Sequence, residues 1–179
     1  MKKFFMSIIL VLALIFGESL AHAAPVQIYD SDVENIIGEL QGVCGMFGID
    51  IWGKEYYTYQ GARRCELNFG NSRKNIIRFR LNNDNSVSRV LITFPTPYIE
   101  SNPVEVLFVL SSIFGELGLN YSEINALTDN LQAKLERTSS YATHFHDKSS
   151  VWCAKTNRYI TLDFELDYSK VDFYLYASK

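Results

Sequence analysis

The first clear pattern of hydrophobic positions in the chain is helical. Apolar residues follow Ser31 at intervals of three and four, which places them on one face of a helix, and glycines mark its end. Ser31 followed by Glu34 has the spacing of a capping box at a helix start. The pattern therefore predicts an amphipathic helix that buries Val33, Ile36, Ile37, Leu40 and Val43.

Four strand-like runs follow this helix, and the first of them contains three tyrosines. They cover residues 54–60, 63–69, 75–81 and 90–94. In the third run apolar residues alternate with arginines, so the apolar set faces a core and the arginines face outward. The apolar set is Ile77, Phe79 and Leu81, and the outward set is Arg78 and Arg80. The pattern predicts consecutive antiparallel strands with one buried face.

The second half of the chain repeats the change from helical to alternating patterns. Asn102 and Pro103 have the residue types of a helix cap and first turn. Ser122 begins another helix with a narrower apolar stripe. In the final hairpin, a register that pairs Asp167 with Lys170 makes every inward pair apolar. The strand-like runs of this half cover residues 141–146, 150–154, 159–167 and 170–177.

These elements predict one α+β domain over residues 24–179, with about seven to eight antiparallel strands and about three helices packed on one face. The segments 30–95 and 103–179 share their element order, which indicates two quasi-repeats of a helix or helix pair followed by four strands. This order is similar to that of secreted β-lactamase inhibitor proteins, which bind enzymes with a sheet face. The resemblance covers element order alone, implies a binding function and carries over no residues.

Residues 1–23 have the layout of a secretory signal peptide. Lys2 and Lys3 precede an apolar run that reaches Phe16, and residues 21–23 (Ala-His-Ala) form a small-x-small cleavage site. The run is shorter than the ~20 apolar residues of a membrane span, and no later run reaches that length. We therefore expect an exported chain, periplasmic or extracellular, without a transmembrane segment after cleavage.

The formal net charge of −3 conceals a split between the two halves. Residues 50–94 contain eight basic and four acidic residues, whereas the chain from residue 95 contains seven basic and eleven acidic residues. We do not expect nucleic acid as a partner, because the chain is predicted to be exported and is acidic overall. We expect a protein or an envelope component to bind the outward basic surface, through Arg78, Arg80, Tyr57 and Tyr59.

Three cysteines, Cys44, Cys65 and Cys153, follow the predicted signal peptide. An oxidising compartment favours one disulfide and one remaining thiol, and three pairings are open. The predicted duplication makes Cys65 and Cys153 equivalent positions, and only the first half has a further cysteine in its helix. We therefore expect a Cys44–Cys65 disulfide, with Cys153 as a small buried apolar residue.

Two histidines supply a candidate for metal chemistry. His144 and His146 lie two positions apart on a predicted strand and share a face, and Asp147 is a candidate third ligand for zinc. The simpler interpretation is two exposed histidines near a turn. Asp163 and Glu165 alternate with core residues and are read as the solvated side of a hairpin.

No nucleophile elbow, Walker loop, H-E-x-x-H sequence or paired C-x-x-C occurs in the chain. The main hypothesis is therefore a non-enzymatic binding module without a cofactor. The alternatives are a small metal-dependent hydrolase that uses His144 and His146, and an envelope structural protein.

Overall fold

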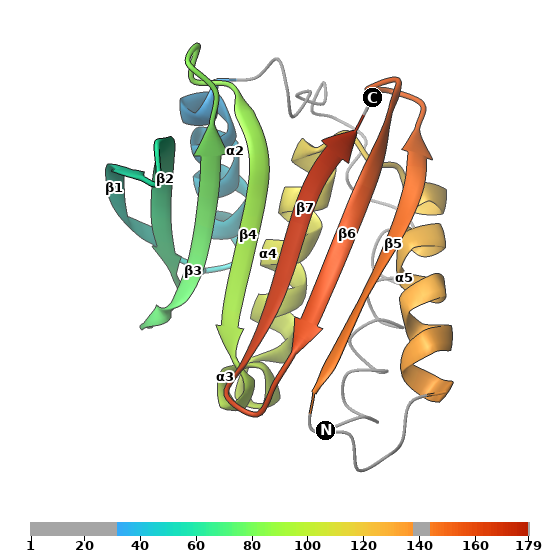
Figure 1. Cartoon of the computed structure of the whole chain (residues 1–179). Coiled ribbons are helices and arrows are strands. Elements are labelled where there is room, and N and C mark those ends of the chain that lie inside the picture. The colour runs from blue at the N-terminus through green and yellow to red at the C-terminus, as the bar shows by residue number, and fades with distance from the viewer. Residues whose placement is uncertain (1–31, 138–143, 179) are drawn as a thin grey trace.

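The computed structural model describes residues 32–137 and 144–178, and the predicted signal peptide lies outside these ranges. The described residues form an α+β fold with four helices and a seven-stranded antiparallel sheet, as the sequence predicts (Figure 1). None of these helices is long and apolar enough to cross a bilayer. In chain order the elements are α2 (Val33–Met46), β1 (Ile51–Tyr59), β2 (Ala62–Phe69), β3 (Ser72–Leu81), β4 (Val87–Pro95), α3 (Thr96–Ser101), α4 (Pro103–Glu116), α5 (Tyr121–Arg137), β5 (Phe145–Cys153), β6 (Arg158–Leu166) and β7 (Lys170–Ser178).

The sheet has one face packed against helices and one open face. Its strand order is β1-β2-β3-β4-β7-β6-β5, and every neighbouring pair is antiparallel. In Figure 1, α2 lies behind the first strands, α4 lies behind the centre and α5 runs along β5. No described helix covers the side that faces the viewer, which we call the open face.

The pairing of β4 with β7 joins the two halves of the chain and is centred on Ile92 opposite Phe173. On one side of this pair, β3, β2 and β1 follow β4, and on the other side β6 and β5 follow β7. The second half has three described strands where four were predicted. The segment predicted to hold a turn between two strands is the continuous strand β5, and residues 138–143 lie outside the described ranges. The duplication itself stays a prediction.

The core face follows the predicted alternation of apolar residues. In β3, Ile77 and Phe79 are fully buried, while the side chains between them point to the open face. The predicted register of the last hairpin is confirmed, because Leu162 lies opposite Leu175 in the β6–β7 pair. Burying a side chain of this size stabilises the fold by about 1.5–3 kcal/mol. The buried core therefore stabilises the sheet from its helix-covered face.

The helix α2 is tied to β1 through its first turn. The Asp32 carboxylate accepts a hydrogen bond from the Glu34 N–H, so Asp32 is the N-cap, and Ser31 lies outside the described residues. The Glu34 carboxylate accepts hydrogen bonds from Lys54 Nζ at 2.9 Å and from the Tyr56 hydroxyl at 2.5 Å. Glu34 therefore links the helix to the edge strand.

All three cysteines are buried free thiols, so the predicted Cys44–Cys65 disulfide is wrong. Cys65 lies opposite Tyr56, whose hydroxyl reaches Glu34 in the first turn of α2. Cys44 follows Glu34 by ten residues, which is about 15 Å along a helix. Its Sγ lies 4.0 Å from Ser112 Oγ on α4. A disulfide needs Cα atoms within about 7 Å. Cys65 on β2 lies beside the start of α2 and Cys44 lies near its end, so the two residues are too far apart to form one.

Candidate functional site

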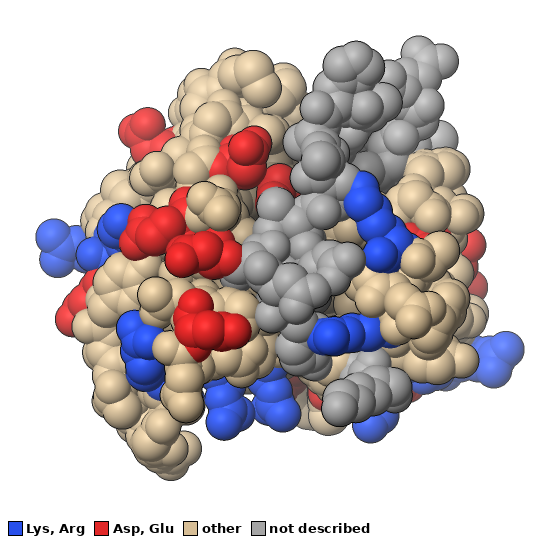
Figure 2. Space-filling model, turned by 90° about the horizontal axis from the view of Figure 1, so that it is seen from above, with Lys and Arg blue, Asp and Glu red and all other residues tan. Residues whose placement is uncertain are grey.

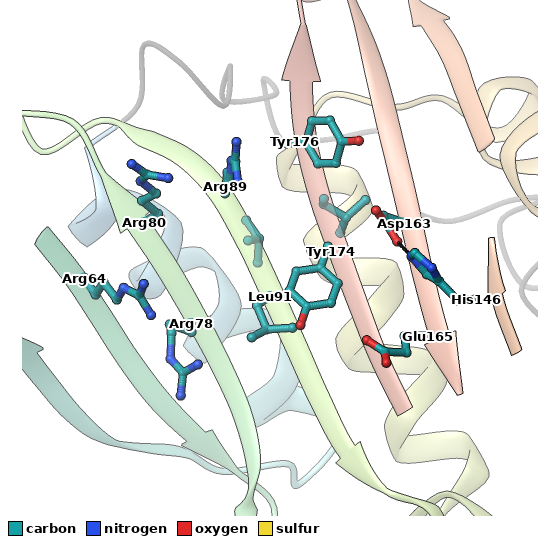
Figure 3. Close-up of a pocket in the computed structure, with 12 residues that line it drawn as sticks. Arg64, Arg78, Arg80, Arg89, Leu91, His146, Asp163, Glu165, Tyr174 and Tyr176 are labelled. Atoms are coloured by element: carbon teal, nitrogen blue, oxygen red, sulfur yellow. Dashed lines mark hydrogen bonds and ion pairs between the residues drawn. The ribbon is translucent and has the colours of Figure 1, made fainter. Parts of the chain in front are cut away.

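The open face carries a shallow depression of about 460 Å³ that is lined from six of the seven strands. This volume lies in the range of ligand-binding sites. Figure 3 shows arginines on the side formed by β2, β3 and β4, acidic residues and a histidine on the side formed by β5 and β6, and tyrosines of β7 between them. The lining includes Arg64, Arg78, Arg80, Arg89, Leu91, His146, Asp163, Glu165, Tyr174 and Tyr176.

Three arginines stand directly opposite one another on neighbouring strands. Arg64 on β2 pairs with Arg80 on β3, and Arg80 pairs with Arg89 on β4. The Arg64 guanidinium lies 4.7 Å from the centre of the Tyr59 ring, and that of Arg89 lies 5.6 Å from the centre of the Tyr176 ring. Seen from above, basic side chains follow the lower edge of the molecule, where the open face lies (Figure 2). We call Arg64, Arg80 and Arg89 the arginine row.

Arg78 belongs to a separate cluster beside this row. Its Nε and Nη2 each lie 2.7 Å from Glu66 Oε2. The Tyr57 hydroxyl donates a hydrogen bond to the same oxygen at 3.0 Å. Burial, followed by this hydrogen bond, raises the pKa of Tyr57, so its hydroxyl stays a donor. Glu66 is thus occupied by Arg78 and Tyr57.

The opposite side of the depression is acidic. His146 Nε2 lies 2.7 Å from Asp163 Oδ1. In the next cross-strand row, Glu165 stands between His146 and Asp172. Asp172 is buried and forms an ion pair with Lys170. The depression therefore has positive charge over β2–β4 and negative charge over β6, where Asp163 and Glu165 stand.

Aromatic side chains stand between and beyond the charged groups. Tyr174 and Tyr176 lie in the middle of the depression (Figure 3). Trp152 and Tyr159 form an edge-to-face pair with ring centres 5.0 Å apart, and they are 44% and 48% exposed. Tyr59, on the edge strand β1 at the opposite edge of the sheet, is 52% exposed. Trp, Tyr and Arg are the residue types that dominate the energetic centres of protein interfaces.

The three predicted metal ligands do not converge. Asp147 Oδ1 lies 2.6 Å from Lys134 Nζ on α5, so Asp147 points to the helix side of β5, whereas His146 points to the open face. His144 precedes β5 and is exposed. Within residues 32–137 and 144–178, no group of three or more His, Cys, Asp or Glu side chains is placed to hold a metal ion. The geometry instead brings His146 to Asp163.

The four predicted binding residues lie together at the basic side of the open face. Tyr57 and Arg78 both donate hydrogen bonds to Glu66. The Tyr59 ring contacts the guanidinium of Arg64, which lies opposite Arg80. Sequence reasoning placed Arg64 near these residues but did not assign Arg89, Tyr174 and Tyr176 to the same surface. The sequence pattern shows that each of these side chains faces outward. It does not show that β4 and β7 are neighbours in the sheet.

Comparison with known proteins gives no relative from which a function could be transferred. No family model, no curated protein and no solved structure matches the chain. The resemblance to β-lactamase inhibitor proteins remains one of element order. The interpretation of the open face therefore depends on its own geometry and chemistry.

Proposed function

We propose that this chain is a non-enzymatic, exported binding module, periplasmic or extracellular, that recognises a protein partner with the open face of its sheet. The observation that carries the proposal is the depression with segregated charge, bordered by exposed Trp152, Tyr159 and Tyr59. Aromatic rings and guanidinium groups provide large contact areas and most of the binding energy at protein interfaces.

The size of the open face fits this function. Seven strands give six spacings of about 4.8 Å, and strands of nine residues are about 30 Å long, so the face covers roughly 900 Å². A standard protein–protein interface buries about 800 Å² on each partner. The face is therefore large enough for one specific partner.

Site-specific photo-cross-linking in the producing cell tests the proposal. A cross-linking amino acid replaces Tyr59 or Trp152 on the open face, and Glu39 on the exposed side of α2 serves as the control position. We expect one discrete cross-linked protein from the two open-face positions and none from the control, because the partner covers only the open face.

Charge reversal adds a second arm to this test. Arg80→Glu should reduce the cross-linked product several-fold, whereas Lys155→Glu in the exposed β5–β6 turn should leave it unchanged. The same products from all three cross-linker positions would contradict a specific open-face partner. That outcome would favour the alternative of an envelope structural protein.

A further inference from the structure

The arginine row places three like charges side by side, which costs stability. Cross-strand neighbours on one face have Cβ atoms about 5 Å apart, and like charges in such positions repel each other. The row spans two strand spacings, so the Cα atoms of Arg64 and Arg89 are about 10 Å apart, with Arg80 between them. Binding sites often retain such locally unfavourable arrangements because a ligand compensates them.

The described residues offer this row no acidic partner. No described carboxylate lies within ion-pair distance of Arg64, Arg80 or Arg89, and Glu66, two positions along β2 from Arg64, is bound to Arg78. The Nε of Arg64 is buried and has no hydrogen-bond acceptor. The tyrosine rings beside the row attract the guanidinium faces. The Tyr57 hydroxyl is a further hydrogen-bond partner of Arg64, but it is neutral and does not compensate the charge of the row.

We propose that the arginine row binds carboxylate side chains of an acidic segment of the partner protein. This inference rests on the proposed function and specifies the chemistry of the partner. A guanidinium group matches a planar carboxylate through two parallel hydrogen bonds. Alternate residues of an extended segment lie about 6.7 Å apart, so two acidic side chains reach across the length of the row.

The remainder of the depression disfavours partners that are anionic throughout. Asp163 and Glu165 line the side beyond Tyr174. An anionic lipid bilayer or a polyanionic glycan would bring its charges against these carboxylates. A protein segment presents carboxylates at one position and a lysine or arginine at another. The depression therefore fits a segment that carries both signs of charge in separate places.

The test uses a synthetic peptide whose first half alternates glutamate with serine and whose second half alternates lysine with serine. A reference peptide has glutamine in place of glutamate. The arginine Nε–H signals of the purified chain are followed by NMR during titration with each peptide. We expect the signals of Arg64, Arg80 and Arg89 to shift with the first peptide only, and the signal of Arg73, exposed at the start of β3, to stay in place.

Substitutions separate binding from structure. Arg80→Gln and Arg89→Gln should each weaken peptide binding about tenfold, and Arg73→Gln should leave it unchanged. Thermal unfolding without peptide provides a second measurement. Arg80→Gln should raise the unfolding midpoint at low ionic strength, and the difference should vanish at high salt, because salt screens the repulsion within the row.

Several outcomes would overturn the inference. Equal binding of the reference peptide, or shifts confined to residues outside the row, would do so, and so would an unchanged or lower midpoint for Arg80→Gln. Tighter binding to phosphatidylglycerol vesicles or to heparin would exclude the assignment to a protein segment. Photo-cross-linking from Trp152 tests the proposed function separately, because it detects an open-face partner whatever the arginines contact. A cross-linked partner together with one of the outcomes above would overturn the inference and leave the proposed function standing.

Discussion

Arg78 and Arg80 occupy outward positions two residues apart on β3, yet their surroundings differ. Arg78 binds Glu66 through two nitrogens, whereas Arg80 stands between two further arginines. The side chains of Arg78 and Glu66 are 28% and 26% exposed, so their ion pair is partly shielded from water. Shielded pairs with two contacts stabilise a fold more than exposed pairs do.

Loss of either partner of this pair should therefore destabilise the protein. Glu66→Gln or Arg78→Gln should each lower the free energy of unfolding by about 1–2 kcal/mol, because each leaves a half-buried charge without its partner. Arg80→Gln on the same strand is the control and should cause no loss. Denaturant unfolding of the single and double variants measures the coupling energy, and a value near zero would count against a stabilising pair.

Among the elements, α2 and α4 pack against each other through apolar and acidic side chains. The rings of Phe47 and Phe108 stack with centres 3.9 Å apart. Burial raises the pKa of Glu116 at the end of α4 from its ordinary 4.5 to about 7, and the charge of Glu39 on α2 adds to the shift. The folded protein therefore binds the Glu116 proton more tightly than the unfolded chain does.

This difference predicts a pH dependence of stability. The unfolded chain releases the Glu116 proton above about 4.5 and the folded protein above about 7, so stability falls as the pH rises between these values and stays reduced above them. Glu116→Gln should remove this decrease and be more stable than the wild type at pH values above 7. Glu39→Gln should give a smaller gain. Thermal unfolding across this pH range is the measurement, and equal pH profiles for wild type and Glu116→Gln would refute it.

At the same scale, the limits of sequence patterns are visible in β5. Alternation predicted β2 to β4 and the register of the final hairpin, because their core faces are continuously apolar. The strand β1 was predicted from its tyrosines, and only Ile51 of it is buried. The polar residues 147–150 resemble a turn, but they lie inside β5. There, Asp147 and the carbonyl of Lys148 both accept hydrogen bonds from Lys134 on α5. This compensation comes from a packed helix, which a local pattern does not report.

In the whole molecule, the open face brings together residues that are far apart in the sequence. The Thr93 hydroxyl donates a hydrogen bond of 2.7 Å to Asp172, 79 positions away, across the β4–β7 pair. The arginine row belongs to the first half of the chain and the acidic side to the second. The outward residues of each half could be predicted, but the depression could not, because alternation does not determine which strands become neighbours.

The buried cysteines give a prediction for the molecule as a whole. Burial raises the pKa of the Cys44 thiol to about 11, and burial also raises the pKa of Cys65. All three cysteine side chains are fully buried, so a thiol reagent at mildly alkaline pH should react with them only after unfolding. A reductant should leave the unfolding midpoint unchanged. A drop of several degrees on reduction would instead reveal a disulfide, which typically contributes about 3 kcal/mol.

The strand β7 comes after every other described strand in the sequence but lies between β4 and β6 in the sheet. During synthesis on the ribosome, β4 therefore keeps an unpaired edge until residues 170–178 have been made. A nascent chain stopped before residue 170 would hold two partial sheets with nothing to join them. Unpaired strand edges are sites at which different molecules associate wrongly, so the facing edges of β4 and β6 are exposed to such contacts until β7 is complete.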